Sequence, residues 1–268
     1  MAENKEEEFN LEEYESEILK ELEQRENYKN SFKDIHITDK QEALKFLKEK
    51  DSADGLFYAY AYSLDDSIKS DDEIYEYLMQ RFMFNRDSLF RDYSRSFVHE
   101  YGEACGKTND KSKIDAALKE IKRFIDEENY YYGYWMFYSL HWATPLEFET
   151  FLEIYKLFEP EKSIQGFLLQ QYRDVFKEKA THGEMIRLLD ASNDECVQYN
   201  WFMAVNNYFF SMDLYNVLLR RGVDKQKLDQ RYEQYQKYET KRREEKFKDQ
   251  DKETNVVKKK KWWKKGKH

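Results

Sequence analysis

The chain of 268 residues has few of the residues that interrupt helices, with two prolines and eight glycines. Average usage is about 5% and 7%, respectively. It has only two cysteines, Cys105 and Cys196, which lie far apart and match no metal-binding or redox spacing. We therefore expect helix nearly throughout. We also expect two reduced thiols, which makes the cytoplasm the default location.

Long apolar runs and catalytic motifs are missing as well. Apolar runs such as Tyr134 to Leu140 are far shorter than the ~20 residues that a membrane-spanning helix needs, and the acidic N-terminus has no apolar core of the kind found in secretory signals. His99 and Glu103 share a helical face near Cys105, but we find no third and fourth zinc ligand nearby. No phosphate-binding loop or hydrolase motif occurs. The sequence predicts no metal, no cofactor and no enzyme.

Charge of both signs is plentiful but unevenly placed. The net charge of the chain is −9, residues 1–30 carry eleven Glu against four basic residues, and residues 258–268 carry seven Lys and no acid. Residues 1–257 therefore carry −16. Such an acidic body repels nucleic acid and anionic lipid, so only the C-terminal tail could attract them.

Two stretches of the chain resemble each other at a spacing of about 75 residues. Ala43 to Leu47 returns as Ala117 to Ile121, and Tyr58 to Leu64 returns as Tyr134 to Leu140. A weaker third copy begins at Met185. Repetition at a near-fixed period indicates stacked helices, because each unit cannot bury its own apolar face alone.

Each copy contains about two helix pairs of roughly 35–38 residues, a length between those of tetratricopeptide and HEAT repeats. Over residues 38–222 the pattern resembles a degenerate HEAT-like or tetratricopeptide-like repeat protein, although the tetratricopeptide signature residues are absent. The predicted fold class is all-α, a solenoid-like stack of helix pairs. The alternative is an irregular helical bundle.

Four segments follow from these patterns. Residues 1–37 form an acidic N-terminal helix or arm, and residues 38–222 form the helical-repeat body. Residues 223–248 form a charged C-terminal helix, and residues 249–268 form a disordered Lys/Trp tail. Within the body, Asp39 and Asp71 are expected to begin helices, and Gly106 to Asp110 to break one that ends near Ala104.

Aromatic residues cover every face of the helix predicted around residues 130–142. One stripe must be core, and the rest either packs between helix pairs or forms a binding groove, since Tyr and Trp dominate interface hot spots. The matching helix of the third copy adds a tryptophan and two asparagines. The candidate protein-binding residues are Tyr131, Tyr134, Trp135, Tyr138, Trp142, Trp201, Asn206 and Asn207.

The C-terminal tail, residues 258–268, has the most distinctive local composition in the sequence. Lysines attract phosphates, and tryptophans stack on bases or lie at lipid headgroups. The alternatives are that the tail associates with the acidic residues 3–26, or that it is a solvated end without function. The candidate residues for binding anions, nucleic acid or a membrane surface are Lys258, Lys259, Lys260, Lys261, Trp262, Trp263, Lys264, Lys265 and Lys267.

The pattern as a whole favours a non-catalytic protein–protein interaction module with an acidic, aromatic-rich surface. A concrete version is an inhibitor or immunity-type protein that masks a basic partner. The alternative is a nucleic-acid or membrane-surface accessory protein that acts through its tail, and a helical enzyme is a third class.

Overall fold

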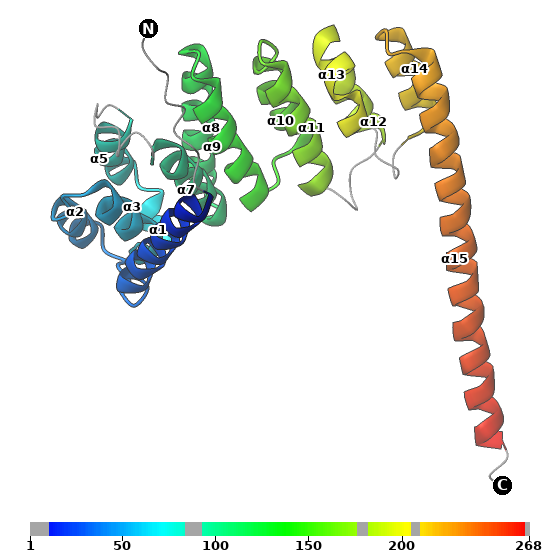
Figure 1. Ribbon diagram of the computed structural model, residues 1–268, viewed down its shortest axis with the longest axis horizontal. Coiled ribbons are helices and arrows are strands. Elements are labelled where there is room, and N and C mark those ends of the chain that lie inside the picture. Colours follow the sequence, from blue (N-terminus) through cyan, green and yellow to red (C-terminus); the bar gives the residue numbers. More distant parts are fainter. Residues whose placement is uncertain (1–10, 84–92, 176–181, 205–209, 266–268) are drawn as a thin grey trace, which may run out of the picture. The chain divides into compact units, whose positions relative to one another are not determined.

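The computed structural model describes residues 11–83, 93–175, 182–204 and 210–265. Within these ranges the chain is all-helical, with fourteen helices and no strand beyond an isolated bridge between Ile37 and Leu64 (Figure 1). The all-α prediction is confirmed. No helix in these ranges combines the length and apolar character needed to cross a membrane.

The chain divides into two compact units, residues 1–145 and 146–268. The helices of the first unit are α1 (Leu11–Phe32), α2 (Lys40–Lys48), α3 (Ala53–Ser63), α4 (Asp66–Lys69), α5 (Asp72–Phe82), α7 (Ser94–Lys107), α8 (Lys111–Asp126) and α9 (Tyr130–Ala143). The helices of the second unit are α10 (Phe148–Leu157), α11 (Lys162–Val175), α12 (His182–Asp190), α13 (Asp194–Ala204), α14 (Met212–Arg220) and α15 (Lys225–Lys265).

Short polar side chains begin several of these helices. The Asp39 carboxylate accepts a hydrogen bond from the Glu42 N–H at 2.9 Å, and the Asp71 carboxylate accepts one from the Glu73 N–H at 3.0 Å. Each bond satisfies a backbone donor that the first helical turn leaves without a partner. The predicted helix starts at Asp39 and Asp71 are therefore confirmed.

In the first unit, α7 packs against α4, α5, α8 and α9. Its Phe97 is fully buried, and its ring centroid lies 5.4 Å from that of Phe82 and 5.6 Å from that of Tyr60. Phe124 and Phe137 are also fully buried, on α8 and α9. Aromatic rings thus pack together with aliphatic side chains such as Leu47, Leu78 and Ile121 in the core of this unit, which accounts for part of the aromatic content of the sequence.

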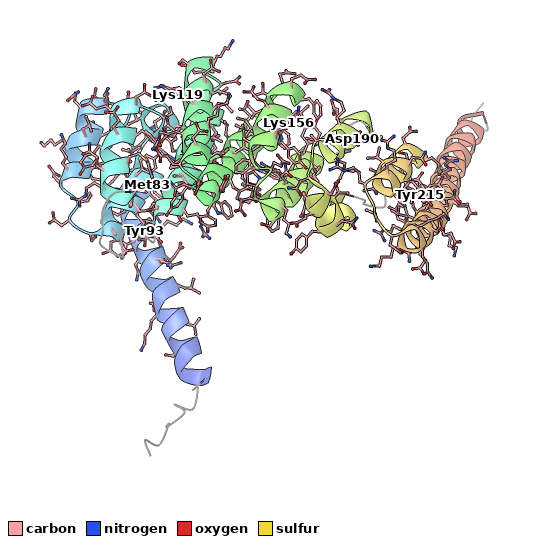
Figure 2. All side chains as sticks on the ribbon, turned by 90° about the horizontal axis from the view of Figure 1, so that it is seen from above. Met83, Tyr93, Lys119, Lys156, Asp190 and Tyr215 are labelled. Carbon is pink, nitrogen blue, oxygen red and sulfur yellow. The ribbon has the colours of Figure 1, made fainter. Side chains whose placement is uncertain are left out.

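In the second unit, helices pack against neighbours one or two places along the chain. α12 contacts α10, α11 and α14, and α11 also contacts α13. The Tyr172 ring on α11 lies 4.8 Å from the Phe151 ring on α10. Figure 2 labels Tyr215, which lies on α14. Its hydroxyl donates a hydrogen bond to Asp229 on α15 at 2.6 Å.

Two boundaries differ from the sequence prediction. α7 continues through Gly106 to Lys107, and the turn falls at Asn109, whose φ of 56° lies in the left-handed region. The sequence predicts disorder from residue 249, yet the backbone of α15 is helical to Lys265. The span Lys225–Lys265 contains no glycine or proline and many Lys, Glu, Gln and Arg, which are strong helix formers.

Candidate functional site: an aromatic face on α9

The helix α9 has a buried side and an aromatic outer side. Gly133, Met136, Phe137 and Leu140 are buried. Four aromatic residues recur on the other side at the spacing of successive helical turns. Together with their neighbour Tyr134 they form a surface that we call the aromatic face. Its members are Tyr131, Tyr134, Trp135, Tyr138 and Trp142.

Two glycines on α7 allow this helix to lie directly against α9. A Cβ atom at Gly102 would lie 2.5 Å from Ser139 Oγ and 2.6 Å from the Met136 carbonyl oxygen. A Cβ atom at Gly106 would lie 2.7 Å from that of Ala143. Since real Cβ atoms do not approach this closely, only glycine permits the packing. This contact sets the position of α7 beside the aromatic face.

The rings of the aromatic face contact one another along the helix. The Tyr138 and Trp142 rings are stacked, with centroids 6.2 Å apart and an interplanar angle of 10°. Trp135 lies 5.7 Å from Tyr138 and 6.3 Å from Tyr131, both edge to face. At the two ends, Tyr131 is 52% exposed and Trp142 is 55% exposed. The face is therefore a ladder of rings whose two outermost members lie in solvent.

Helix α7 supplies the polar border of this face. The Arg95 guanidinium lies 5.2 Å above the Trp135 ring and donates a hydrogen bond to the Tyr131 hydroxyl at 3.5 Å. His99 lies 6.1 Å from Trp135, and burial lowers its pKa, against the opposing effect of the Glu103 charge. Burial also raises the pKa of Tyr134 to about 12. The face thus presents aromatic rings with the Arg95 cation at one edge.

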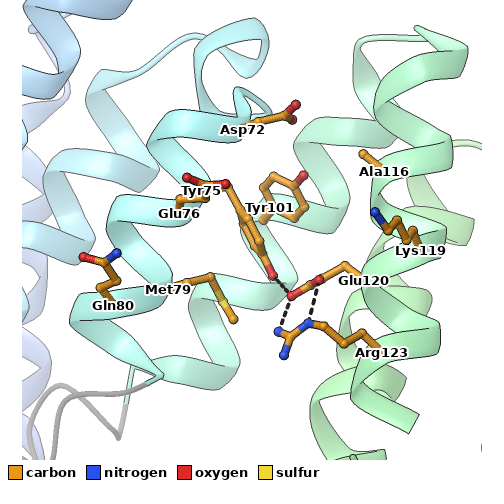
Figure 3. A pocket seen from close by; sticks show the side chains of 10 residues that line it. All are labelled: Asp72, Tyr75, Glu76, Met79, Gln80, Tyr101, Ala116, Lys119, Glu120 and Arg123. Atoms are coloured by element: carbon orange, nitrogen blue, oxygen red, sulfur yellow. Dashed lines mark hydrogen bonds and ion pairs between the residues drawn. The ribbon is translucent and has the colours of Figure 1, made fainter. Parts of the chain in front are cut away.

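A second feature of the first unit is a cleft of about 450 Å³ between α5, α7 and α8 (Figure 3). The Tyr75 hydroxyl on α5 donates to the Glu120 carboxylate on α8, which also accepts from Arg123 Nε at 2.9 Å. The Nη1 atom of Arg123 in turn donates a hydrogen bond to Glu127 Oε1 at 2.8 Å. The residues that line the cleft are Asp72, Tyr75, Glu76, Met79, Gln80, Tyr101, Ala116, Lys119, Glu120 and Arg123.

Two tyrosines of this cleft and the Cys105 thiol, which is on the same helix as Tyr101, have raised pKa values. Burial, and then the Glu120 charge, hold the pKa of Tyr75 far above its usual value, and burial does the same for the pKa of Tyr101. Burial raises the pKa of the Cys105 thiol to about 12, so its reactive thiolate form is suppressed. The Tyr75–Glu120–Arg123 chain is thus a structural link between α5 and α8.

The structure thus brings the five candidate residues of α9 together on one helix. Trp201 belongs to α13, but its side chain lies outside the described part of the structure, as do Asn206 and Asn207 entirely. The backbone from Lys258 to Lys265 belongs to α15. The side chains of these tail candidates, and Lys267 entirely, lie outside the described part.

Most of the groups that border the face and the cleft have no signature in the sequence. Arg95 precedes Trp135 by 40 residues, and Tyr75 precedes Glu120 by 45. The exception is the spacing of Glu120, Arg123 and Glu127, which predicts that the three side chains are neighbours on one helix.

Comparison with known proteins gives no match: no protein-family model, no curated protein and no solved structure matches this chain. The function must therefore be inferred from the residues themselves.

Proposed function

We propose that this protein is a non-catalytic protein-binding module that holds a basic partner protein against the aromatic face of α9. A concrete form of this function is an inhibitor or immunity-type protein that masks its partner. The observation that carries the proposal is the ladder of rings on α9, whose ends Tyr131 and Trp142 are more than half exposed.

The composition of the face is that of an interface hot spot. Trp, Tyr and Arg are the residues most enriched among those that dominate binding energy, and the face combines two tryptophans, three tyrosines and the adjoining Arg95. Its rings already contact one another, so little side-chain freedom remains to be lost when a partner binds.

Charge supports a basic partner. Residues 1–145 carry 33 acidic and 20 basic residues, a net charge of −13. A field of this sign accelerates encounter with a positively charged surface and slows encounter with acidic ones. Acidic side chains are dense on α1 and at the start of α5, where Asp71, Asp72 and Glu73 follow one another. We infer that long-range attraction brings the partner in and that the aromatic face holds it.

The repeat pattern supports a solenoid-like scaffold for this surface. The two matching aromatic segments fall on α3 and α9, and each of these helices follows the helix that carries the other repeated segment, α2 or α8. In the second unit, the contacts of α10 with α12 and of α11 with α13 skip one helix. Contacts of that kind are expected where successive helix pairs stack. The two buried cysteines fit a reducing compartment, and we propose a cytoplasmic location.

The test compares two double variants that remove equally exposed aromatic residues. In the first, Tyr131→Ala is combined with Trp142→Ala. In the control, Phe167→Ala is combined with Tyr199→Ala, which removes rings that are 52% and 59% exposed in the second unit. Each protein is used to purify bound proteins from the source cells, and the partners are quantified by mass spectrometry.

We expect basic partners to be retained by the wild type and the control and to be lost from the first variant. Loss of two hot-spot residues, each worth at least about 2 kcal/mol, lowers affinity by more than about a hundredfold. Retention of the same partners by all three proteins would refute the assignment of the face.

The second candidate function is contact with an anionic surface through the tail. It is favoured by the composition of the end of α15, where Trp262 and Trp263 lie among lysines. Lysines neutralise phosphates, and tryptophans stack on bases or lie at headgroups. The salt dependence of this binding is its test.

A further inference from the structure

A cluster of metal-ligating side chains lies on α7, next to the aromatic face. We propose that His99, Glu100 and Glu103 bind one divalent transition-metal ion of the Zn²⁺ or Co²⁺ type. One ligand atom from each of the three side chains can be chosen such that all three atoms lie within 4.8 Å of one another. The spacing of His99 and Glu103 in the sequence offers no third ligand, and Glu100 supplies it.

The geometry is close to that of a metal site. The imidazole Nδ1 of His99 lies 3.9 Å from an Oε atom of Glu103, one helical turn further on. Metal–ligand bonds of about 2.0–2.2 Å in a tetrahedral site place ligand atoms roughly 3.4 Å apart. The three groups therefore need to move by about an ångström, which rotation of the two glutamate side chains provides.

The positions of the ligands are set by the packing of α7. Gly102 and Gly106 place one side of the helix against α9, which brings His99 within 6.3 Å of the Tyr138 ring. On the other side, Glu100 faces Lys69 of α4 at 3.8 Å. All three ligand residues are partly buried. Partial burial limits competition from water and leaves a path for an ion.

The chemistry of the three groups selects the metal. An imidazole together with two carboxylates suits Zn²⁺, Co²⁺ and similar ions, whereas Mg²⁺ and Ca²⁺ prefer oxygen ligands alone. Three protein ligands leave a fourth position for water or for a side chain of a partner. The inference concerns binding of the ion and does not rest on the proposed function.

Two lysines neutralise the carboxylates when no ion is bound. Lys107 Nζ lies 2.6 Å from Glu103, and its side chain is about half exposed, so it can turn into solvent. Lys69 is nearly buried and lies 3.3 Å from Asp66, which remains its partner when Glu100 turns to the ion. Because an ion must displace Lys107, this ion pair should weaken the apparent affinity of the site for the metal.

The test is a titration of the full-length, untagged protein with Zn²⁺ by calorimetry and with Co²⁺ by visible absorption. The variants are His99→Ala, Glu103→Gln and Lys107→Met, with His36→Ala as the matched control because His36 is exposed and lies outside the cluster. Circular dichroism during unfolding verifies that each variant is folded.

We expect one equivalent of metal to bind to the wild type and the control. His99→Ala and Glu103→Gln should each weaken binding at least about tenfold, the minimum that loss of a supporting group costs. Lys107→Met should strengthen it, because the competing cation is gone. The proposal is overturned if the wild type binds no ion, if His99→Ala binds as tightly as the wild type, or if Lys107→Met weakens binding.

Discussion

Replacement of Gly102 by alanine should destabilise the protein, although alanine is the better helix former. The new Cβ would lie 2.5 Å from Ser139 Oγ and 2.6 Å from the Met136 carbonyl oxygen. The serine can rotate, but the carbonyl belongs to the backbone of α9, so the two helices must separate. Overpacking of this kind lowers the free energy of unfolding by about 1–3 kcal/mol. The higher helix propensity of alanine offsets about 1 kcal/mol of this loss. Because a backbone atom must move, we expect a net loss of about 1–2 kcal/mol.

Gly133 on α9 provides the matched control. A Cβ atom there would lie 3.3 Å from Ile125 Cγ1 and 3.5 Å from the Ile121 carbonyl oxygen, which small shifts accommodate. Gly133→Ala should therefore stabilise the protein by up to about 1 kcal/mol. The measurement is urea unfolding followed by circular dichroism. The packing argument is refuted if Gly102→Ala proves as stable as Gly133→Ala.

Three further perturbations have calculable outcomes. Burial lowers the pKa of His141 to about 3, so only the unfolded chain takes up this proton between pH 6.5 and 3. The contribution of His141 to stability should be constant above pH 6.5 and fall by up to about 1.4 kcal/mol per pH unit between pH 6.5 and 3. Urea unfolding at about pH 7.5 and about pH 5 should show this fall, and His141→Gln should reduce it. Glu120→Ala should cost about 1–3 kcal/mol, because the Tyr75 hydroxyl loses its acceptor, whereas Tyr75→Phe should cost about 1 kcal/mol; equal losses in urea unfolding would contradict this. Single-stranded nucleic acid should bind weakly with a logarithmic salt slope no steeper than about −5, by fluorescence anisotropy, and deletion of residues 258–268 should abolish binding.

The helices of this chain follow from its sequence because their signals are local. Few prolines and glycines, together with capping residues such as Asp39 and Asp71, predict helices that the structure shows. The role of Gly106 does not follow, since a glycine that ends a helix and one that admits a neighbouring helix look alike in sequence. What distinguishes them is the approach of α9, and that contact involves residues more than 30 positions away.

The candidate site is predictable to a similar degree. The spacing of Tyr131, Trp135, Tyr138 and Trp142 is enough to place them on one side of a helix. Which side of α9 is buried depends on its packing against α7 and α8. No local sequence pattern predicts that packing. Arg95 cannot be recognised from the sequence for that reason. Glu100 escapes recognition because residues adjacent on a helix normally point about 100° apart.

Site-specific crosslinking tests the central claim most directly. A photoreactive phenylalanine analogue is placed at Tyr131 or Trp142 in separate proteins, and at Phe167 or Tyr199 as equally exposed controls. After irradiation in the source cells, the first two positions should yield a covalent complex with a basic protein, and the controls should not. Crosslinks to the same protein from the control positions alone would show that the aromatic face of α9 is not the binding surface.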